Sequence, residues 1–158
     1  AAPSHGVTGA LAGAAALGNT WRLARWQGHR TWREPLLLVL HVGYAWLAIG
    51  LGLIALTALT GAVAQTAALH ALTAGAMGVM PAAVMTRATL GHTCRALTAG
   101  ASSAVLFAAI ALAAVLRIAA SLAGGWYLDL LSASALAWIA GFGLYLAIYA
   151  PIQLKPRR

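Results

Sequence analysis

Long apolar stretches alternate with short polar segments along the chain. Five stretches stand out, at residues 5–26, 35–60, 66–90, 98–122 and 126–150. Each approaches the roughly 20 apolar residues that an α-helix needs to cross a bilayer. The pattern therefore predicts an all-α protein, a polytopic transmembrane helix bundle with about five spans. The stretch 5–26 is the weakest because it consists largely of Gly and Ala, and a surface helix is the alternative there.

Several residues mark where the predicted helices begin and end. Pro35 suits a first helical turn, where the missing N–H is not needed, and Gly61 suits a left-handed residue at a helix C-terminus. Thr98 can cap the fourth helix, and residues 123–125 form a short turn into the fifth. Connectors this short place consecutive helices antiparallel and side by side.

Composition supports a membrane protein. Hydrophobic residues make up 62% of the 158 residues and charged residues 8%, whereas a soluble domain carries about 25% charged residues. The net charge of +8 does not indicate a nucleic-acid partner, because the basic residues lie between apolar stretches, where they orient helices in lipid. The one cysteine, Cys94, excludes an internal disulfide.

Basic residues fall almost entirely on one side of the predicted bundle. Only Arg117 lies toward the other side. Basic residues are enriched in cytoplasmic loops, so the N-terminus is predicted outside and the C-terminus in the cytoplasm. The nine residues that share the cytoplasmic side are Arg22, Arg25, Arg30, Arg33, Arg87, Arg95, Lys155, Arg157 and Arg158.

The third stretch collects the residues that are unusual for a membrane helix. At 100° per residue, five residues of this helix lie within about 40° of one line drawn along its surface, measured around the helix axis. Pro81 removes a backbone hydrogen bond and is expected to kink the helix, which frees the carbonyl of Met77. The five residues on the line are His70, Met77, Pro81, Ala88 and His92.

Two of these residues are histidines, and neutral imidazole is a common ligand of haem iron and copper. His70 and His92 are 22 residues apart, about 33 Å at 1.5 Å per residue, so they cannot bind one metal ion. Two candidate sites result: His41 with His92 on the cytoplasmic side, and His70 with His5, or with a ligand outside this chain, on the outer side. Met77 adds a thioether that suits copper. Each histidine could instead form a hydrogen bond between helices.

The arginines have competing roles. Arg117 and Asp129 are predicted to lie at similar depth in one hairpin, and an ion pair between them is the favoured interpretation. The alternative is that Arg117, on the same side as His70, neutralises a haem propionate. Arg87 either anchors its helix or holds an anion. Cys94 follows His92 closely, but no orienting acid accompanies the pair, so a hydrolase has little support.

Two blocks resemble the later part of NnrS family proteins: "GHRTWREPLLLVLHVGYAWLAIG" at residues 28–50 and "HALTAGAMGVMPAAVMTRATLGHTCR" at residues 70–95. The resemblance covers mainly residues 28–97. It implies a multi-pass protein of the bacterial inner membrane that is associated with haem, for which a b-type is expected, with copper and with the response to nitric oxide. It makes four residues the closest counterparts of the family's shared polar positions: His41, His70, Arg87 and His92.

The sequence departs from the family pattern at Cys94, where glycine is expected, and at Pro81, where an ordinary apolar residue is expected. Family members are also typically more than twice as long. The chain is therefore interpreted as one transmembrane helical domain, residues 1–158, with the carboxy-terminal part of a larger protein as one interpretation.

Three functions follow, in order of support. The first is a haem-binding membrane protein of the nitric oxide response, with copper as a second candidate cofactor; whether it turns over a substrate is left open. The second is a cofactor-free accessory subunit that packs among partner subunits in a larger respiratory or photosynthetic complex, as the small-residue spacings Gly9-xxx-Gly13 and Ala137-xxx-Gly141 suggest. The third, a small transporter, lacks an acidic coupling residue deep in the membrane.

Overall fold

A computed structural model describes residues 5–31 and 33–154. The described residues form five long helical rods and no strand. The third rod is continuous but holds a π-helical turn, η2, in its first half, and single turns of 3₁₀-helix, η1 (Gly28–Thr31) and η3 (Gly124–Trp126), lie in two of the connectors. The rods are α1 (His5–Arg25), α2 (Pro35–Thr60), α3–η2–α4 (Gln65–His70, Ala71–Ala76, Met77–His92), α5 (Ala101–Leu122) and α6 (Tyr127–Leu154).

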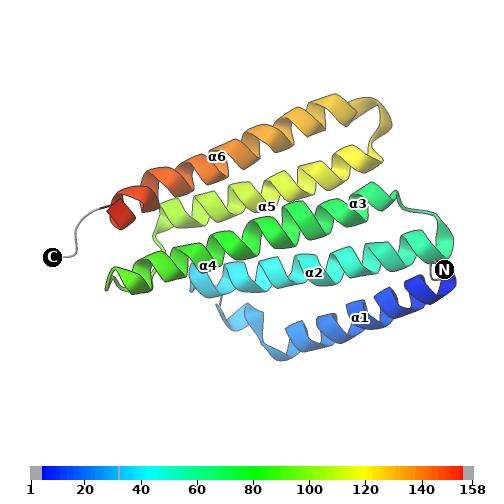
Figure 1. Ribbon diagram of the computed structural model, residues 1–158, viewed down its shortest axis with the longest axis horizontal. Coiled ribbons are helices and arrows are strands. Elements are labelled where there is room, and N and C mark those ends of the chain that lie inside the picture. Colours follow the sequence, from blue (N-terminus) through cyan, green and yellow to red (C-terminus); the bar gives the residue numbers. More distant parts are fainter. Residues whose placement is uncertain (1–4, 32, 155–158) are drawn as a thin grey trace.

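The rods lie side by side and antiparallel (Figure 1). Helix α1 packs on α2, α2 packs on the α3–η2–α4 rod, this rod packs on α5, and α5 packs on α6. Helix α6 also contacts α4. The predicted all-α helix bundle is therefore confirmed, and α1 and α6 form its two edges.

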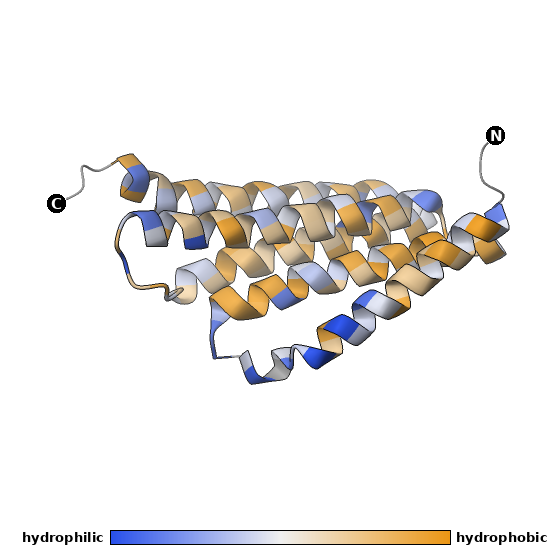
Figure 2. Cartoon of the chain, turned by 60° about the horizontal axis from the view of Figure 1, so that its bottom comes forward, coloured by the Kyte–Doolittle hydropathy of each residue, from blue (hydrophilic) through white to orange (hydrophobic). Residues whose placement is uncertain are grey.

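The five predicted helices are present, and four of them are candidate membrane spans. Four helical segments are long and apolar enough to cross a membrane: Pro35–Thr60, Gln65–His92, Ala101–Leu122 and Gly124–Leu154. Helix α1 is long enough at 21 residues, but it is too rich in Gly and polar residues, as its mixed colouring in Figure 2 shows. It nevertheless lies along α2. The side that each terminus faces stays a prediction.

Glycines let bulky side chains of one helix reach the backbone of the next. The ring of Trp46 on α2 covers Gly75, where an added Cβ would lie 2.7 Å from Trp46 Cδ2. A Cβ at Gly141 on α6 would lie 2.6 Å from Ile110 Cγ1 and only 3.2 Å from the Ile110 backbone nitrogen on α5. Because lipid is as apolar as these side chains, close packing of this kind is a main source of helix association in a membrane.

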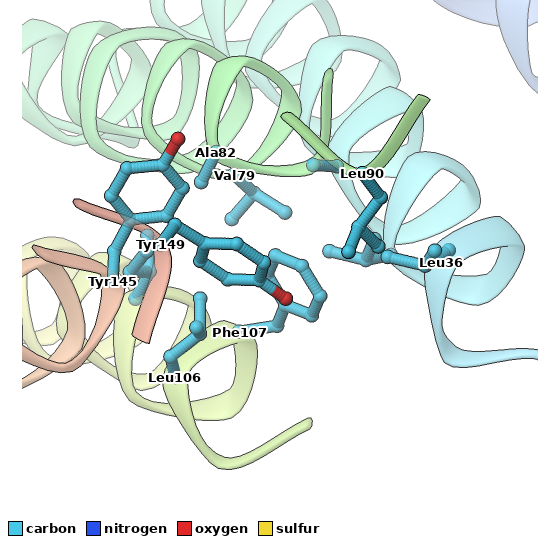
Figure 3. Packing of buried hydrophobic residues seen from close by; sticks show 11 residues of the cluster. Leu36, Val79, Ala82, Leu90, Leu106, Phe107, Tyr145 and Tyr149 are labelled. Atoms are coloured by element: carbon cyan, nitrogen blue, oxygen red, sulfur yellow. The ribbon is translucent and has the colours of Figure 1, made fainter. Parts of the chain in front are cut away.

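The core of the bundle lies between α2, α4, α5 and α6, and Figure 3 shows part of it. Two hydrogen bonds fasten α6 to its neighbours at one end of this core. The Tyr149 hydroxyl and the Ser103 hydroxyl on α5 are 2.6 Å apart, and Gln153 Nε2 donates to Thr89 Oγ1 on α4 at 2.6 Å. These bonds satisfy polar side chains that the bilayer would otherwise leave without partners.

Most of the predicted helix boundaries are confirmed. Pro35 is the first residue of α2, and Gly61 has φ 66° and donates its N–H to Thr57 O. The cap at Thr98 is wrong. Helix α5 starts at Ala101 after Gly100, whose extended backbone carbonyl accepts the first helical hydrogen bonds from Ser103 and Ala104 without a capping side chain.

The exposed, free Cys94, between α4 and α5, can test the orientation. A membrane-impermeant maleimide should leave Cys94 unlabelled in intact cells and label it in inverted membrane vesicles, because the basic connectors are expected in the cytoplasm. A Gly125→Cys variant on a Cys94→Ser background, at the other end of the bundle, should label in the opposite way. Labelling of Cys94 in intact cells would show that the protein has the opposite orientation in the membrane.

Gly141→Leu should lower the free energy of unfolding by about 1–3 kcal/mol, because its side chain would collide with the backbone of α5. Reversible denaturation of the protein in mixed micelles measures the change. Gly143→Leu is the matched control, since nothing lies within 4 Å of a Cβ there, and it should change stability by less than about 0.5 kcal/mol. Equal losses in the two variants would show that helix contact at Gly141 is not the cause.

Candidate functional site

The π-helical turn η2 directly follows His70. A π-helical turn is wider than an α-helical one, so it rotates the residues that follow away from their ideal α-helical directions. The structure accordingly separates His70 from Met77, which is 70% exposed on the outside of the bundle. Helix α4 continues through Pro81, and the irregular turn ends just before Met77, the residue whose carbonyl Pro81 leaves without its usual donor. The straight line of residues predicted from helix periodicity is therefore interrupted.

His70 lies in a groove bounded by the α3–η2 segment and the first half of α6, into which Arg117 extends from α5. Two adjoining hollows, of about 500 Å³ and about 270 Å³, both include His70 and Arg117. We call the pair the His70–Arg117 groove. The larger hollow is further lined by Thr73, Ala74, Leu131, Ser134, Ala135, Trp138 and Ile139, and the smaller by Thr66, Ala120, Ser121, Gly124 and Tyr127.

Polarity changes along the groove. The hollow near the α5–α6 turn holds the hydroxyl side chains of Thr66, Ser121 and Tyr127. The other end holds the apolar surfaces of Trp138 and Ile139. The ring of Trp138 packs against that of Phe142 in a tilted arrangement, with ring centroids 4.8 Å apart. The groove therefore suits an amphipathic ligand with a polar end near the turn and an apolar body near Trp138.

The expected ion pair between Arg117 and Asp129 is not formed. Asp129 is exposed in the first turn of α6, and no ion pair joins it to Arg117 within the described ranges. The hairpin is not symmetric, because η3 precedes α6 and rotates its first turn. Equal depth was predicted from the spacing, but the direction of the two side chains was not. Arg117 instead shares the groove with His70; its pairing with a haem propionate stays a prediction.

His41 faces α1 and the connector after it. Its Cδ2 lies 2.7 Å from the position of a Cβ on Gly28, its ring meets Trp26 edge-on at 6.0 Å, and its Nδ1 donates to Leu37 O at 2.8 Å. Gly43, which is about 200° further round α2 at 100° per residue, packs against Met80 of α4. His41 therefore points away from α4, and the structure does not bring it together with His92.

His92 instead lies in a pocket between α4 and α6, which we call the His92–Tyr145 pocket. Its volume is about 480 Å³, and no charged side chain is among the described residues that line it: Met85, Ala88, Thr89, His92, Thr93, Tyr145 and Gln153. Arg87, half-buried on α4, is not part of this lining. The pocket is lined by residues near the C-terminal ends of α4 and α6, whereas the His70–Arg117 groove is near the start of the same two rods.

The remaining metal-ligand candidates are also apart. His5 is exposed at the start of α1, which packs on α2 and lies at the edge of the bundle, so it does not reach His70 in the groove. Within the part of the chain that the structure describes, no group of three His, Cys, Asp or Glu side chains is arranged to hold a metal ion. A metal site formed by this chain alone would therefore use few protein ligands.

Comparison with known families places the whole chain in one of them. The family described as NnrS protein matches residues 1–157. The chain belongs to the NnrS family. This match extends the resemblance well beyond the two blocks at residues 28–97. Neither the curated proteins nor the solved structures that were compared contain a match to the chain.

Sequence reasoning missed part of both sites of this NnrS family chain. Trp138, Tyr145 and Gln153 line the two sites, but the sequence patterns did not single them out as site residues. A signal for the latter two was present, because Tyr145, Tyr149 and Gln153 follow one another at four-residue spacing and so share one face of the last helix. Ser134 was also missed; its hydroxyl donates to Ala113 O at 2.7 Å and holds α6 against α5 beside the groove.

Thr86 on α4 is fully buried, and its Oγ1 has no hydrogen-bond partner among the described residues. Thr86→Val should therefore raise the free energy of unfolding by about 1–3 kcal/mol, because it removes an unsatisfied hydroxyl while keeping the shape of the side chain. Denaturation in mixed micelles measures this change. Thr89→Val is the matched control on the same helix and should lower stability by about 1 kcal/mol, since Thr89 accepts a hydrogen bond from Gln153. Destabilisation by both variants would mean that the Thr86 hydroxyl has a partner in the membrane.

Proposed function

We propose that this NnrS family protein takes part in the nitric oxide response and binds haem in the His70–Arg117 groove. The observation that carries the proposal is that His70 and Arg117 line both hollows of one groove within the bundle. Family membership supports a membrane protein of the nitric oxide response. The association of the NnrS family with haem and copper supports the choice of cofactor. The four apolar helices support its place in a membrane.

The residues of the groove fit a haem group. Its larger hollow, about 500 Å³, falls in the range of about 300–1,000 Å³ that is usual for ligand sites. The imidazole of His70 would bind the iron, and the guanidinium of Arg117 would pair with a propionate, for which its planar donors are suited. Trp138 and Ile139 would contact the apolar macrocycle. Haem held there would supply an iron that can bind nitric oxide.

His70 is the one histidine among the described residues that line the groove. The hydroxyl of Ser134 is engaged by Ala113 O and points its proton away from a ligand. The groove therefore supplies a single strong iron ligand from this chain. The polar mouth at Thr66, Ser121 and Tyr127 would keep the propionate end toward water, which lowers the cost of holding charge in the membrane.

Copper is the second candidate cofactor. His41, His92 and Met77 carry nitrogen and sulfur donors that suit it, but they lie on three separate surfaces: against α1, in the pocket beside α6, and on the outside of the bundle. A copper site at any one of them would need further ligands. Arg87 keeps its two proposed roles, as an anchor and as a partner for an anion at the C-terminal end of α4.

The purified protein should show a Soret band that shifts when nitric oxide is added, and elemental analysis should find iron. His70→Ala should remove the band, and Arg117→Gln should weaken haem affinity by about 10-fold or more, since hydrogen bonds to charged groups contribute about 1.5–3 kcal/mol. His5→Ala is the matched control and should leave the spectrum unchanged, because His5 lies outside the groove.

A protein with neither iron nor a Soret band would overturn the haem proposal. Persistent partner subunits in native mass spectrometry, without cofactor mass, would then favour the accessory-subunit hypothesis. An unshifted Soret band in the presence of nitric oxide would contradict the assigned response while leaving haem binding in place.

A further inference from the structure

The His92–Tyr145 pocket, at the other end of the bundle, holds an unsatisfied donor. Tyr145 is 8% exposed, and its hydroxyl has no hydrogen-bond partner among the described residues. Tyr149, one turn further along α6, differs in this respect because its hydroxyl is paired with Ser103. Figure 3 shows the two hydroxyls pointing in different directions, that of Tyr145 toward α4. The Tyr145 hydroxyl is not among the fully buried atoms that lack a partner, and Tyr145 lines the pocket, so this hydroxyl can donate a hydrogen bond to a ligand bound there.

The polar groups of the pocket are hydrogen-bond donors and acceptors without net charge. His92 is exposed at its rim and, in its neutral form, carries one ring N–H donor. Gln153 is held in place by its bond to Thr89. No charged side chain is among the described lining residues. This excludes the anion chemistry of the His70–Arg117 groove and indicates a neutral ligand with hydrogen-bond-accepting oxygens.

The pocket also opens toward lipid. Met85 and Ala88 line it and are exposed on the outer surface of α4, within one of the candidate membrane spans. A ligand can therefore enter from the bilayer with an apolar tail in contact with Met85. The polar residues His92 and Gln153 lie at the ends of their helices, where a membrane helix reaches the head-group region.

We infer that the His92–Tyr145 pocket binds the head group of a membrane quinone. A quinone is neutral, dissolves in the bilayer through its apolar tail, and carries two carbonyl oxygens on opposite sides of a flat ring. The hydroxyl of Tyr145 donates to one carbonyl and the imidazole N–H of His92 donates to the other. The inference goes beyond the haem proposal and does not depend on it, because the two sites share no residue.

The test uses the full chain in lipid nanodiscs and decylubiquinone as the probe, with bound quinone measured by equilibrium dialysis against empty nanodiscs. Tyr145→Phe and His92→Ala should each weaken binding about 5-fold, the effect of one net hydrogen bond. Tyr149→Phe is the matched control: it removes a tyrosine hydroxyl from the same helix, outside the pocket, and should leave the affinity unchanged. Monodisperse elution and helical circular dichroism check that each variant is folded.

A second pair of variants tests the cavity itself. Ala88→Trp should fill the pocket and abolish binding, whereas Ala140→Trp, at an exposed position of α6 outside the pocket, should not. Decylbenzene, which has the tail and ring but no carbonyl groups, should bind at least 10-fold more weakly than the quinone. Equal binding of the two probes, or an affinity that Tyr145→Phe, His92→Ala and Ala88→Trp all leave unchanged, would overturn the inference. Absence of quinone binding to the wild-type chain would overturn it as well.

Discussion

Close contact between helices at glycine is the constraint on which the other features of this bundle depend. Inside a bilayer the helices gain little from hiding apolar surface, so their association depends on how closely they pack and on the hydrogen bonds between them. Trp138 lies against Gly78, and Ile110 lies against Gly141, near the middle of the α3–η2–α4 rod, of α5 and of α6. These contacts hold the three helices together at mid-height. The His70–Arg117 groove lies on one side of them along α6, and the His92–Tyr145 pocket lies on the other, so the packing that stabilises the bundle also separates its two candidate sites.

Hydrogen bonds between helices act at the same places. Ser134 joins α6 to α5 beside the groove, and Gln153 joins α6 to α4 beside the pocket. Each bond fixes the distance between two helices whose surfaces form a site. Loss of such a bond would therefore change the width of a site as well as the stability of the bundle. Thr86 is the exception among the buried polar side chains of the described residues, since it has no partner.

The sequence was sufficient to predict the helices and to place His70 and Arg117 at the same end of the bundle. Pro35 and Gly61 were identified correctly as the boundaries of α2, and His70 and Arg117 were predicted on the same side of the membrane. The direction of side chains around each helix could not be predicted in this way. The periodicity argument assumes 100° per residue, and the π-helical turn at residues 71–76 breaks that assumption between His70 and Met77. The depth argument for Arg117 and Asp129 likewise carried no information on the turn that rotates α6. All five predicted helices are present, but α1 is not among the four candidate spans, because too much of it is Gly, Asn or Thr to be as apolar as the others.

The charge of Arg117 distinguishes the two sites in physical terms. Asp and Glu together number 2 in the chain, and neither forms an ion pair with Arg117 in the described ranges. A guanidinium that is half-buried within a candidate span, without a carboxylate beside it, is costly. An anionic group bound in the groove would remove much of that cost, and the same attraction would hold the ligand, so the protein and an acidic ligand stabilise each other there. The His92–Tyr145 pocket has no such charge to neutralise, and its Tyr145 hydroxyl and His92 imidazole can donate hydrogen bonds to a neutral ligand. Arg117 on α5 therefore distinguishes the two candidate sites: it gives the groove a positive charge, whereas no charged side chain is among the described residues that line the pocket.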